Sequence, residues 1–268
     1  MEADLKASNP KTLIYAPDAQ LRYIPIAALH DGNQWLTQRY AINHITAQSL
    51  TNLTAQPSPQ PKILAGAIGN QEVTITVGNE VFSFSGLLYT HDEVQAIRST
   101  QPTTKVVLDN EFSLPQVKPQ LGDYTILHLA THASLVPQKV DNSFILFGNQ
   151  TYATLRDIEN WSLNNFDLVI LSACETGLGG KFGSNGEEIL GLGYQFQRRG
   201  AKATIASLWR VNDAGTQQLM AAFYQALQQG KSKTQALKIA QTDLIGKSAI
   251  GLSHPYYWSP FILIGNGL

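Results

Sequence analysis

A short apolar run that stops just before the only cysteine of the chain constrains the fold more than any other segment. Leu168 to Leu171 are consecutive apolar residues, Cys174 follows three positions later, and glycines are dense between residues 177 and 186. An unbroken apolar run of this kind is typical of a strand buried on both faces of a parallel sheet. Ligands and chemistry gather where such strands end at their carboxyl edge. The segment therefore predicts an α/β fold that presents one thiol at that edge.

The remaining apolar runs extend this prediction to a whole sheet. A second buried strand is predicted over 125–131, ending at His132, and a third over 203–209. Helical patterns between the strands predict a mainly parallel central sheet with helices on both faces. Alternating polar and apolar residues over 72–85 predict an additional β-hairpin.

Residues 12–268 are expected to form one domain, preceded by a polar lead-in or cut end at 1–11. The proline-rich segment 56–61 is either a sub-boundary inside this domain or a surface loop.

Three segments carry helix-start signals. Thr90 with Glu93, and Ser232 with Gln235, have the spacing of capping boxes. Asp213 precedes a helical pattern over 214–229 and is a candidate N-cap for that helix.

Composition excludes several classes of function. The chain has 268 residues, 19 Lys and Arg against 20 Asp and Glu, and a net charge of −1, so no basic excess indicates contact with nucleic acid or an anionic membrane. One cysteine cannot form an internal disulfide, which fits a reducing, cytoplasmic setting. The glycine-rich segment lacks the Gly-Lys-Ser/Thr ending of a phosphate loop, and neither a cofactor nor a metal is expected.

Cys174 and His132 together predict a cysteine–histidine dyad. A thiolate is the attacking species, and an imidazole can take the thiol proton and later protonate the leaving amine. The backbone amides of Ala133 and Cys174 are natural donors to an oxyanion. Taken singly, Cys174 fits a small core residue and His132 a structural histidine. His128, inside the same predicted strand, is expected to be packed and hydrogen-bonded rather than catalytic.

Several ordered motifs resemble the CHAT domain, a family in the caspase clan with the separases and gingipains. They are His128-Leu-Ala-Thr-His132, Leu171-Ser-Ala-Cys174-Glu-Thr-Gly177, Ala206-Ser-Leu-Trp209 with Asp213, Asp18 to Leu29, Glu188 to Gly193, and His254 to Phe261. The resemblance implies a caspase-like three-layer sandwich. It also implies a cysteine endopeptidase that uses His132 as base, Cys174 as nucleophile and a thioester intermediate, with the amides of Ala133 and Cys174 forming the oxyanion hole.

The resemblance also bears on specificity and rate. By similarity to separases, Asp213 would lie in the S1 pocket and bind a basic P1 side chain. Glu175 is a weaker alternative, either for contacting substrate or for orienting His132. The family usually has glycine where this chain has Ala133, so a positive φ at this position would strain it.

Alternatives from other classes stay open at this point. A non-catalytic caspase-fold scaffold or regulatory module is the main one, and an acyltransferase or ligase with the same dyad is another. The expected partners are a protein or peptide substrate and, by family resemblance, a tetratricopeptide-repeat domain in the same or another chain.

Overall fold

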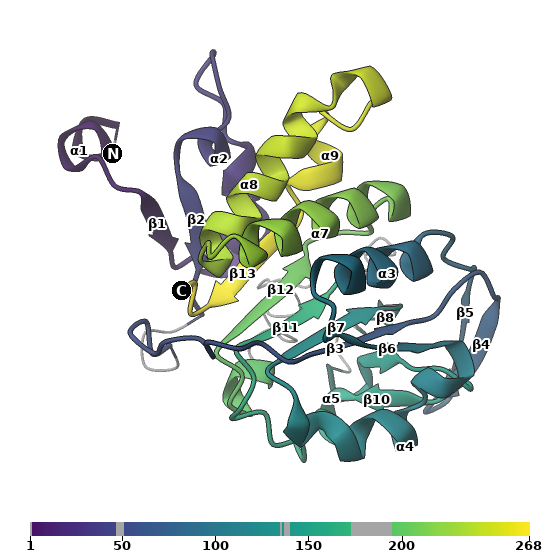
Figure 1. Cartoon of the computed structure of the whole chain (residues 1–268). Helices are drawn as coiled ribbons and strands as arrows, with labels where there is room; N and C mark the ends of the chain where they lie inside the picture. Colours follow the sequence, from purple (N-terminus) through teal and green to yellow (C-terminus); the bar gives the residue numbers. More distant parts are fainter. Residues whose placement is uncertain (1, 47–50, 135, 137–139, 173–194) are drawn as a thin grey trace.

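A computed structural model of the chain describes residues 2–46, 51–134, 136, 140–172 and 195–268. An eight-stranded sheet crosses the molecule, with helices packed on both of its faces (Figure 1). Its strand order is β1-β2-β13-β12-β11-β7-β3-β6. Smaller sheets, β10-β9-β8 and β4-β5, lie beside it. None of the described helices has the length and apolarity needed to cross a membrane.

The elements have the following bounds. The strands are β1 (Thr12–Tyr15), β2 (Ala41–His44), β3 (Ile63–Ala67), β4 (Val73–Val77), β5 (Glu80–Phe84), β6 (Lys105–Leu108), β7 (Ile126–Ala130), β8 (Ala133–Ser134), β9 (Phe144–Leu146), β10 (Tyr152–Thr154), β11 (Leu168–Leu171), β12 (Ala203–Ser207) and β13 (Phe261–Gly265). The α-helices are α1 (Glu2–Ser8), α2 (Leu36–Arg39), α3 (Thr90–Thr100), α4 (Leu114–Val117), α5 (Leu155–Ile158), α7 (Asp213–Gln228), α8 (Lys233–Gly246) and α9 (Pro255–Trp258). The 3₁₀ helices are η1 (Ala19–Tyr23), η2 (Ile26–Ala28), η4 (Asp109–Phe112), η5 (Lys118–Asp123), η6 (Val140–Asn142) and η7 (Ser248–Ile250).

The central sheet is mainly parallel, as predicted. Strands β6, β3, β7, β11 and β12 are parallel to one another. Strand β13 is antiparallel to β12, and the last two strands, β2 and β1, are parallel to β13. The carboxyl ends of β3, β7, β11 and β12 therefore share one edge, where an α/β sheet places its chemistry.

The strands at the centre of this sheet are buried on both faces, which explains their unbroken apolar sequences. In β11, Val169 and Leu171 pack with residues of α4 and β9, whereas Leu168 and Ile170 pack with α7 and α8. Strand β7 alternates in the same way. The sheet thus separates two apolar cores, and three helices, α3, α7 and α8, cover one of them (Figure 1).

The predicted hairpin and one of the two predicted capping boxes are confirmed, and the other capping box is wrong. The hairpin β4-β5 forms, with alternating burial along β4, and Ser232 caps α8 together with Gln235. The predicted capping box at the start of α3 does not form, because both of its side chains bond to the sheet instead. Thr90 donates to the backbone oxygen of Ile68 at 2.7 Å, and the Glu93 carboxylate lies 2.7 Å from His128.

The proline-rich segment 56–61 joins two strands, β2 and β3, that belong to the same sheet. It is tied to the start of β11 by the backbone N–H of Ser58, which donates to Asp167 at 2.7 Å. Lys202 bonds both the Asp167 carboxylate and the backbone oxygen of Gln56.

His44, at the end of β2, makes stability depend on pH. Burial lowers its pKa from 6.5 to about 4. The unfolded chain therefore binds a proton below pH 6.5 that the folded chain binds only near pH 4, and stability falls as the pH drops through this window. We expect wild type to lose about 2 kcal/mol of unfolding free energy between pH 7 and pH 4.5 relative to His44→Gln. Urea unfolding at the two pH values measures the difference, and equal losses in both proteins would contradict the assignment.

Candidate active site

His132 lies two residues beyond the end of β7, at the carboxyl edge of the sheet, and its side chain is buried. Its ring stacks on Phe84, with centroids 4.7 Å apart, and Nε2 lies 3.0 Å from the backbone oxygen of Ser85. The backbone oxygen of His132 accepts from the N–H of Leu146 at 2.8 Å. The hairpin on one side and β9 on the other therefore fix the imidazole in position.

The contact with Ser85 determines which imidazole nitrogen can act as a base. A carbonyl oxygen only accepts hydrogen bonds, so Nε2 must carry the proton in the neutral ring. Nδ1 is then the nitrogen with the basic lone pair. A backbone carbonyl thus does for His132 what a carboxylate does in a catalytic triad: it holds the tautomer and the ring orientation.

Ala133 begins β8 and is extended, so the strain that a positive φ would impose on alanine is absent there. In the antiparallel β8-β9 ladder, His132 lies opposite Leu146. Because the N–H of Leu146 donates to the backbone oxygen of His132, these two residues occupy a hydrogen-bonded position of the ladder. Bonded and non-bonded pairs alternate in such ladders, so Ala133, opposite Ile145, occupies a non-bonded position. Its N–H points away from β9, as an oxyanion donor requires.

The predicted nucleophile Cys174 and the alternative substrate contact Glu175 lie outside the described residues. Strand β11, which leads to them, is the parallel neighbour of β7. Its residues pair with β7 residues 42 positions earlier, as in Ile170 with His128 and Leu171 with Leu129. Cys174 follows His132 in the sequence by the same 42 positions.

Asp213 does not cap its own helix, so that interpretation is wrong. Asn212 is the N-cap of α7, its side chain accepting from Gly215, and Asp213 is the first helical residue. Asp213 Oδ2 instead accepts from the backbone N–H of Tyr89 at 2.7 Å, at the start of α3. Its Oδ1 is buried and makes no hydrogen bond of good geometry to the described residues, although the backbone N–H of Leu88, like that of Tyr89, acts on the carboxylate and partly offsets the rise in its pKa. Burial, aided by the charge of Glu93, raises the pKa of this half-buried carboxyl.

The segment between the hairpin and α3 links the two candidate residues. Ser85, at its start, contacts His132, and Tyr89, at its end, contacts Asp213. Gly86 permits this path, because a Cβ there would lie 2.7 Å from the backbone of Asn70. The sequence predicted the hairpin but not the contacts that Phe84 and Ser85 make with His132. Gly86, just beyond the hairpin, is the one local sequence signal that this segment passes close to another part of the backbone.

His128 is buried and hydrogen-bonded, as predicted, between two helices. Its Nε2 lies 2.7 Å from the Glu93 carboxylate of α3, and its Nδ1 lies 3.2 Å from the Tyr224 hydroxyl of α7. A carboxylate can only accept, so Nε2 donates to Glu93 and Nδ1 accepts from Tyr224. Burial and the charge of Glu93 raise the pKa of Tyr224 and keep its hydroxyl protonated. This network attaches α3 and α7, the helices that meet at Asp213, to the strand that leads to His132.

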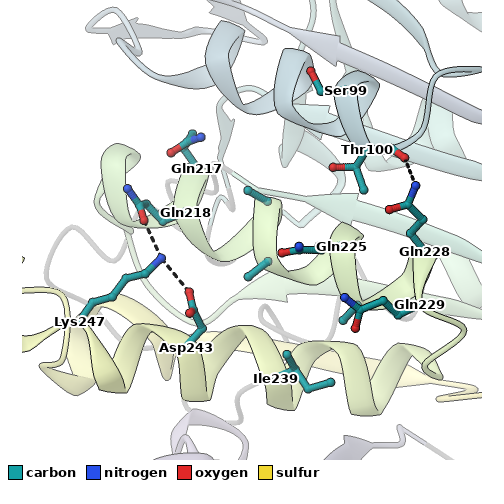
Figure 2. A pocket seen from close by; sticks show the side chains of 13 residues that line it. Ser99, Thr100, Gln217, Gln218, Gln225, Gln228, Gln229, Ile239, Asp243 and Lys247 are labelled. Carbon is teal, nitrogen blue, oxygen red and sulfur yellow. Dashed lines mark hydrogen bonds and ion pairs between the residues drawn. The ribbon is translucent and has the colours of Figure 1, made fainter.

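A surface cavity of about 670 Å³ lies away from these residues, between α3, α7 and α8 (Figure 2). Glutamines dominate its lining, and Lys247 bonds Gln218 and Asp243 across it, each at 2.7 Å. His132, Ala133 and Asp213, the predicted site residues that the structure describes, do not line it.

Comparison with known structures defines the class of fold. The Arg-specific cysteine proteinase gingipain R is similar over 99% of this chain and 65% of its own, with a TM-score of 0.63 and 10% identity. The separase of Saccharomyces cerevisiae, in its complex with securin, is similar over 91% of this chain but only 14% of its own, with a TM-score of 0.58 and 12% identity. The fold is therefore that of the caspase-like cysteine peptidases.

The sequence comparison then gives the family. The CHAT domain profile matches residues 1–266, and the chain belongs to this family. A search of curated protein sequences finds no match.

Proposed function

We propose that this protein is a cysteine endopeptidase in which His132 activates Cys174. The observation that carries the proposal is the bond between His132 Nε2 and the Ser85 carbonyl, because it prepares Nδ1 as a base at the carboxyl edge of the sheet. The register of β7 and β11 supports the pairing, since the offset between paired residues equals the spacing between His132 and Cys174.

The proposed reaction has the following steps. Nδ1 takes the thiol proton, and the Cys174 thiolate attacks the scissile carbonyl carbon. The resulting oxyanion accepts hydrogen bonds from the N–H groups of Ala133 and Cys174. The imidazolium then protonates the leaving amine, which breaks the C–N bond and leaves a thioester on Cys174. Water, deprotonated by His132, hydrolyses the thioester and regenerates the thiol.

A basic P1 residue is the proposed substrate feature, with Asp213 as its partner. Oδ1 makes no hydrogen bond of good geometry to any residue that the structure describes, and it would serve as the acceptor for a guanidinium or ammonium group. Tyr89 holds the other oxygen, which fixes the carboxylate before substrate binds.

Thiol alkylation tests the proposal without a known substrate. Cys174 is the sole thiol, so iodoacetamide uptake measured against pH reports its state directly. We expect an apparent thiol pKa clearly below the ordinary value of about 8.5, and a rise toward or above that value in His132→Ala. His30→Ala, which removes an exposed histidine, is the matched control and should behave like wild type. Slow labelling with an ordinary pKa in wild type would instead favour a non-catalytic scaffold.

A further inference from the structure

The residue after β6 has an unusual backbone conformation and lies at the same edge of the sheet as His132. Asp109 directly follows β6, which is parallel to β3 and β7, and its φ is +49°, in the left-handed region that non-glycine residues rarely adopt. Its backbone is closely packed, because a Cβ on Gly148 would lie 1.6 Å from the Asp109 backbone oxygen. Such a conformation persists only where the surrounding structure fixes it, and residues of this kind gather at functional sites.

The side chain of Asp109 bonds two other segments at this edge. Its Oδ1 accepts from the backbone N–H of Gly69, just beyond β3, at 2.9 Å. The same oxygen lies 3.1 Å from Nε2 of His91, in the first turn of α3, and Nε2 donates because a carboxylate can only accept. Gly69 leaves room for the His91 ring, since a Cβ there would lie 2.6 Å from Nε2. Asp109 therefore ties the end of β3 to the start of α3.

The same part of the chain also holds segment 85–91, which contacts both candidate site residues. The backbone oxygen of Gly69 accepts from the N–H of Leu87 at 3.1 Å. The backbone oxygen of Ile68, in the same peptide unit as the Gly69 N–H, accepts from the Thr90 hydroxyl at 2.7 Å. A shift of Gly69 would therefore loosen the segment at two points.

We propose that Asp109 is a positioning residue for the candidate active site, and that it acts by keeping segment 85–91 in place. The segment carries the effect to the site near both of its ends. Its Ser85 carbonyl fixes the tautomer of His132, and its Tyr89 N–H holds the carboxylate proposed to bind a basic P1 residue. The effect on the His132 ring follows from the contacts alone, whereas the effect on catalysis rests on the proposed function.

Nitrogen NMR of the full chain with ¹⁵N-labelled histidine tests the role of Asp109 without a substrate. At about pH 8.5, above the ordinary histidine pKa of about 6.5, the neutral His132 ring of wild type should show one tautomer, with well separated signals for protonated Nε2 and unprotonated Nδ1. His132→Gln identifies these signals. Asp109→Gly suits the positive φ but removes the carboxylate. The two signals should move toward each other in this variant, because a released ring exchanges between tautomers.

Thiol labelling and peptide cleavage then connect Asp109 to the proposed reaction. Asp109→Gly should raise the apparent thiol pKa of Cys174 toward that of His132→Ala, and it should lower kcat/KM for an arginine P1 peptide by about tenfold to 100-fold, since small displacements remote from the chemistry can cost this much. An ordinary thiol pKa in wild type would count against the peptidase alone, because the His132 spectrum decides the role of Asp109 without it.

Two further variants separate the carboxylate contacts from the backbone conformation. Asp109→Asn keeps an oxygen that can accept from both Gly69 and His91, so it should retain the wild-type spectrum and kcat/KM within about twofold. Asn9→Gly is the matched control, because it places glycine at an exposed position with φ +41° before β1, at the other end of the strand order, and it should behave like wild type.

Unchanged His132 signals in Asp109→Gly, or an equal change in Asp109→Asn or Asn9→Gly, would overturn the proposal. Thermal unfolding shows whether each variant folds. If Asp109→Gly does not fold, His91→Ala replaces it, because it removes only the contact at the start of α3. That variant should move the His132 signals in the same direction, and unchanged signals there would overturn the proposal.

Discussion

Substituting His132→Ala is expected to lower kcat/KM for a peptide with arginine at P1 by about 10,000-fold, or about 5 kcal/mol of transition-state stabilisation. The loss is large because one imidazole acts as base in the attack and as acid in the departure of the amine. Cys174→Ala should lose at least as much. Since the two residues act as one unit, the double variant should be no slower than the slower single variant.

Fluorogenic peptide cleavage measures these effects, and thermal unfolding shows whether each variant folds. His30→Ala again serves as the control and should retain full activity. Cleavage by His132→Ala within tenfold of wild type would remove His132 from the mechanism. Losses that simply add in the double variant would show two independent contributions instead of a dyad.

Asp213→Asn is expected to lower kcat/KM for an arginine P1 peptide by about 100-fold to 1,000-fold, because removing one partner of a desolvated charge pair typically costs about 2–5 kcal/mol. A peptide with a neutral P1 residue should be cleaved at nearly the wild-type rate. The amide oxygen of the variant can still accept from the Tyr89 N–H, so the start of α3 keeps its contact. Because burial disfavours the ionised form of Asp213, the variant should also have a Tm at least as high as that of wild type.

The raised pKa of Asp213 adds a pH signature. A protonated carboxyl cannot pair with a cation, so the preference for arginine should disappear as the pH falls, at a higher pH than an exposed aspartate would give. The matched control is Asp92→Asn, an exposed carboxyl in the first turn of α3. Equal losses for arginine and neutral peptides in Asp213→Asn would mean that the carboxylate only supports α3.

The arrangement of the sheet was largely predictable because its central strands are buried on both faces. Their apolar runs are continuous, and parallel neighbours bring their carboxyl ends to one edge. That places His132 beyond the end of β7, and β11, the strand before Cys174, beside β7. The hairpin was also predictable, since an alternating pattern around a turn is local information.

Contacts between distant segments were not predictable from local patterns. Thr90 and Glu93 have capping-box spacing, but the Glu93 carboxylate bonds His128, 35 positions away. A buried carboxylate is costly without a hydrogen-bond partner, and this cost outweighs the gain from capping the helix. Asp213 bonds Tyr89, 124 positions away, because α7 starts beside the start of α3. Ser85 acts through its backbone oxygen, which no side-chain pattern records.

The central claim is that Cys174 is a nucleophile prepared by His132, and covalent capture tests it most directly. Intact-mass spectrometry should follow the protein incubated with a peptidyl acyloxymethyl ketone that carries arginine at P1. Because the chain has one cysteine, we predict a single adduct on wild type within minutes, located on Cys174, and no adduct over the same period on His132→Ala. No adduct on wild type, or equally fast capture by His132→Ala, would contradict the account.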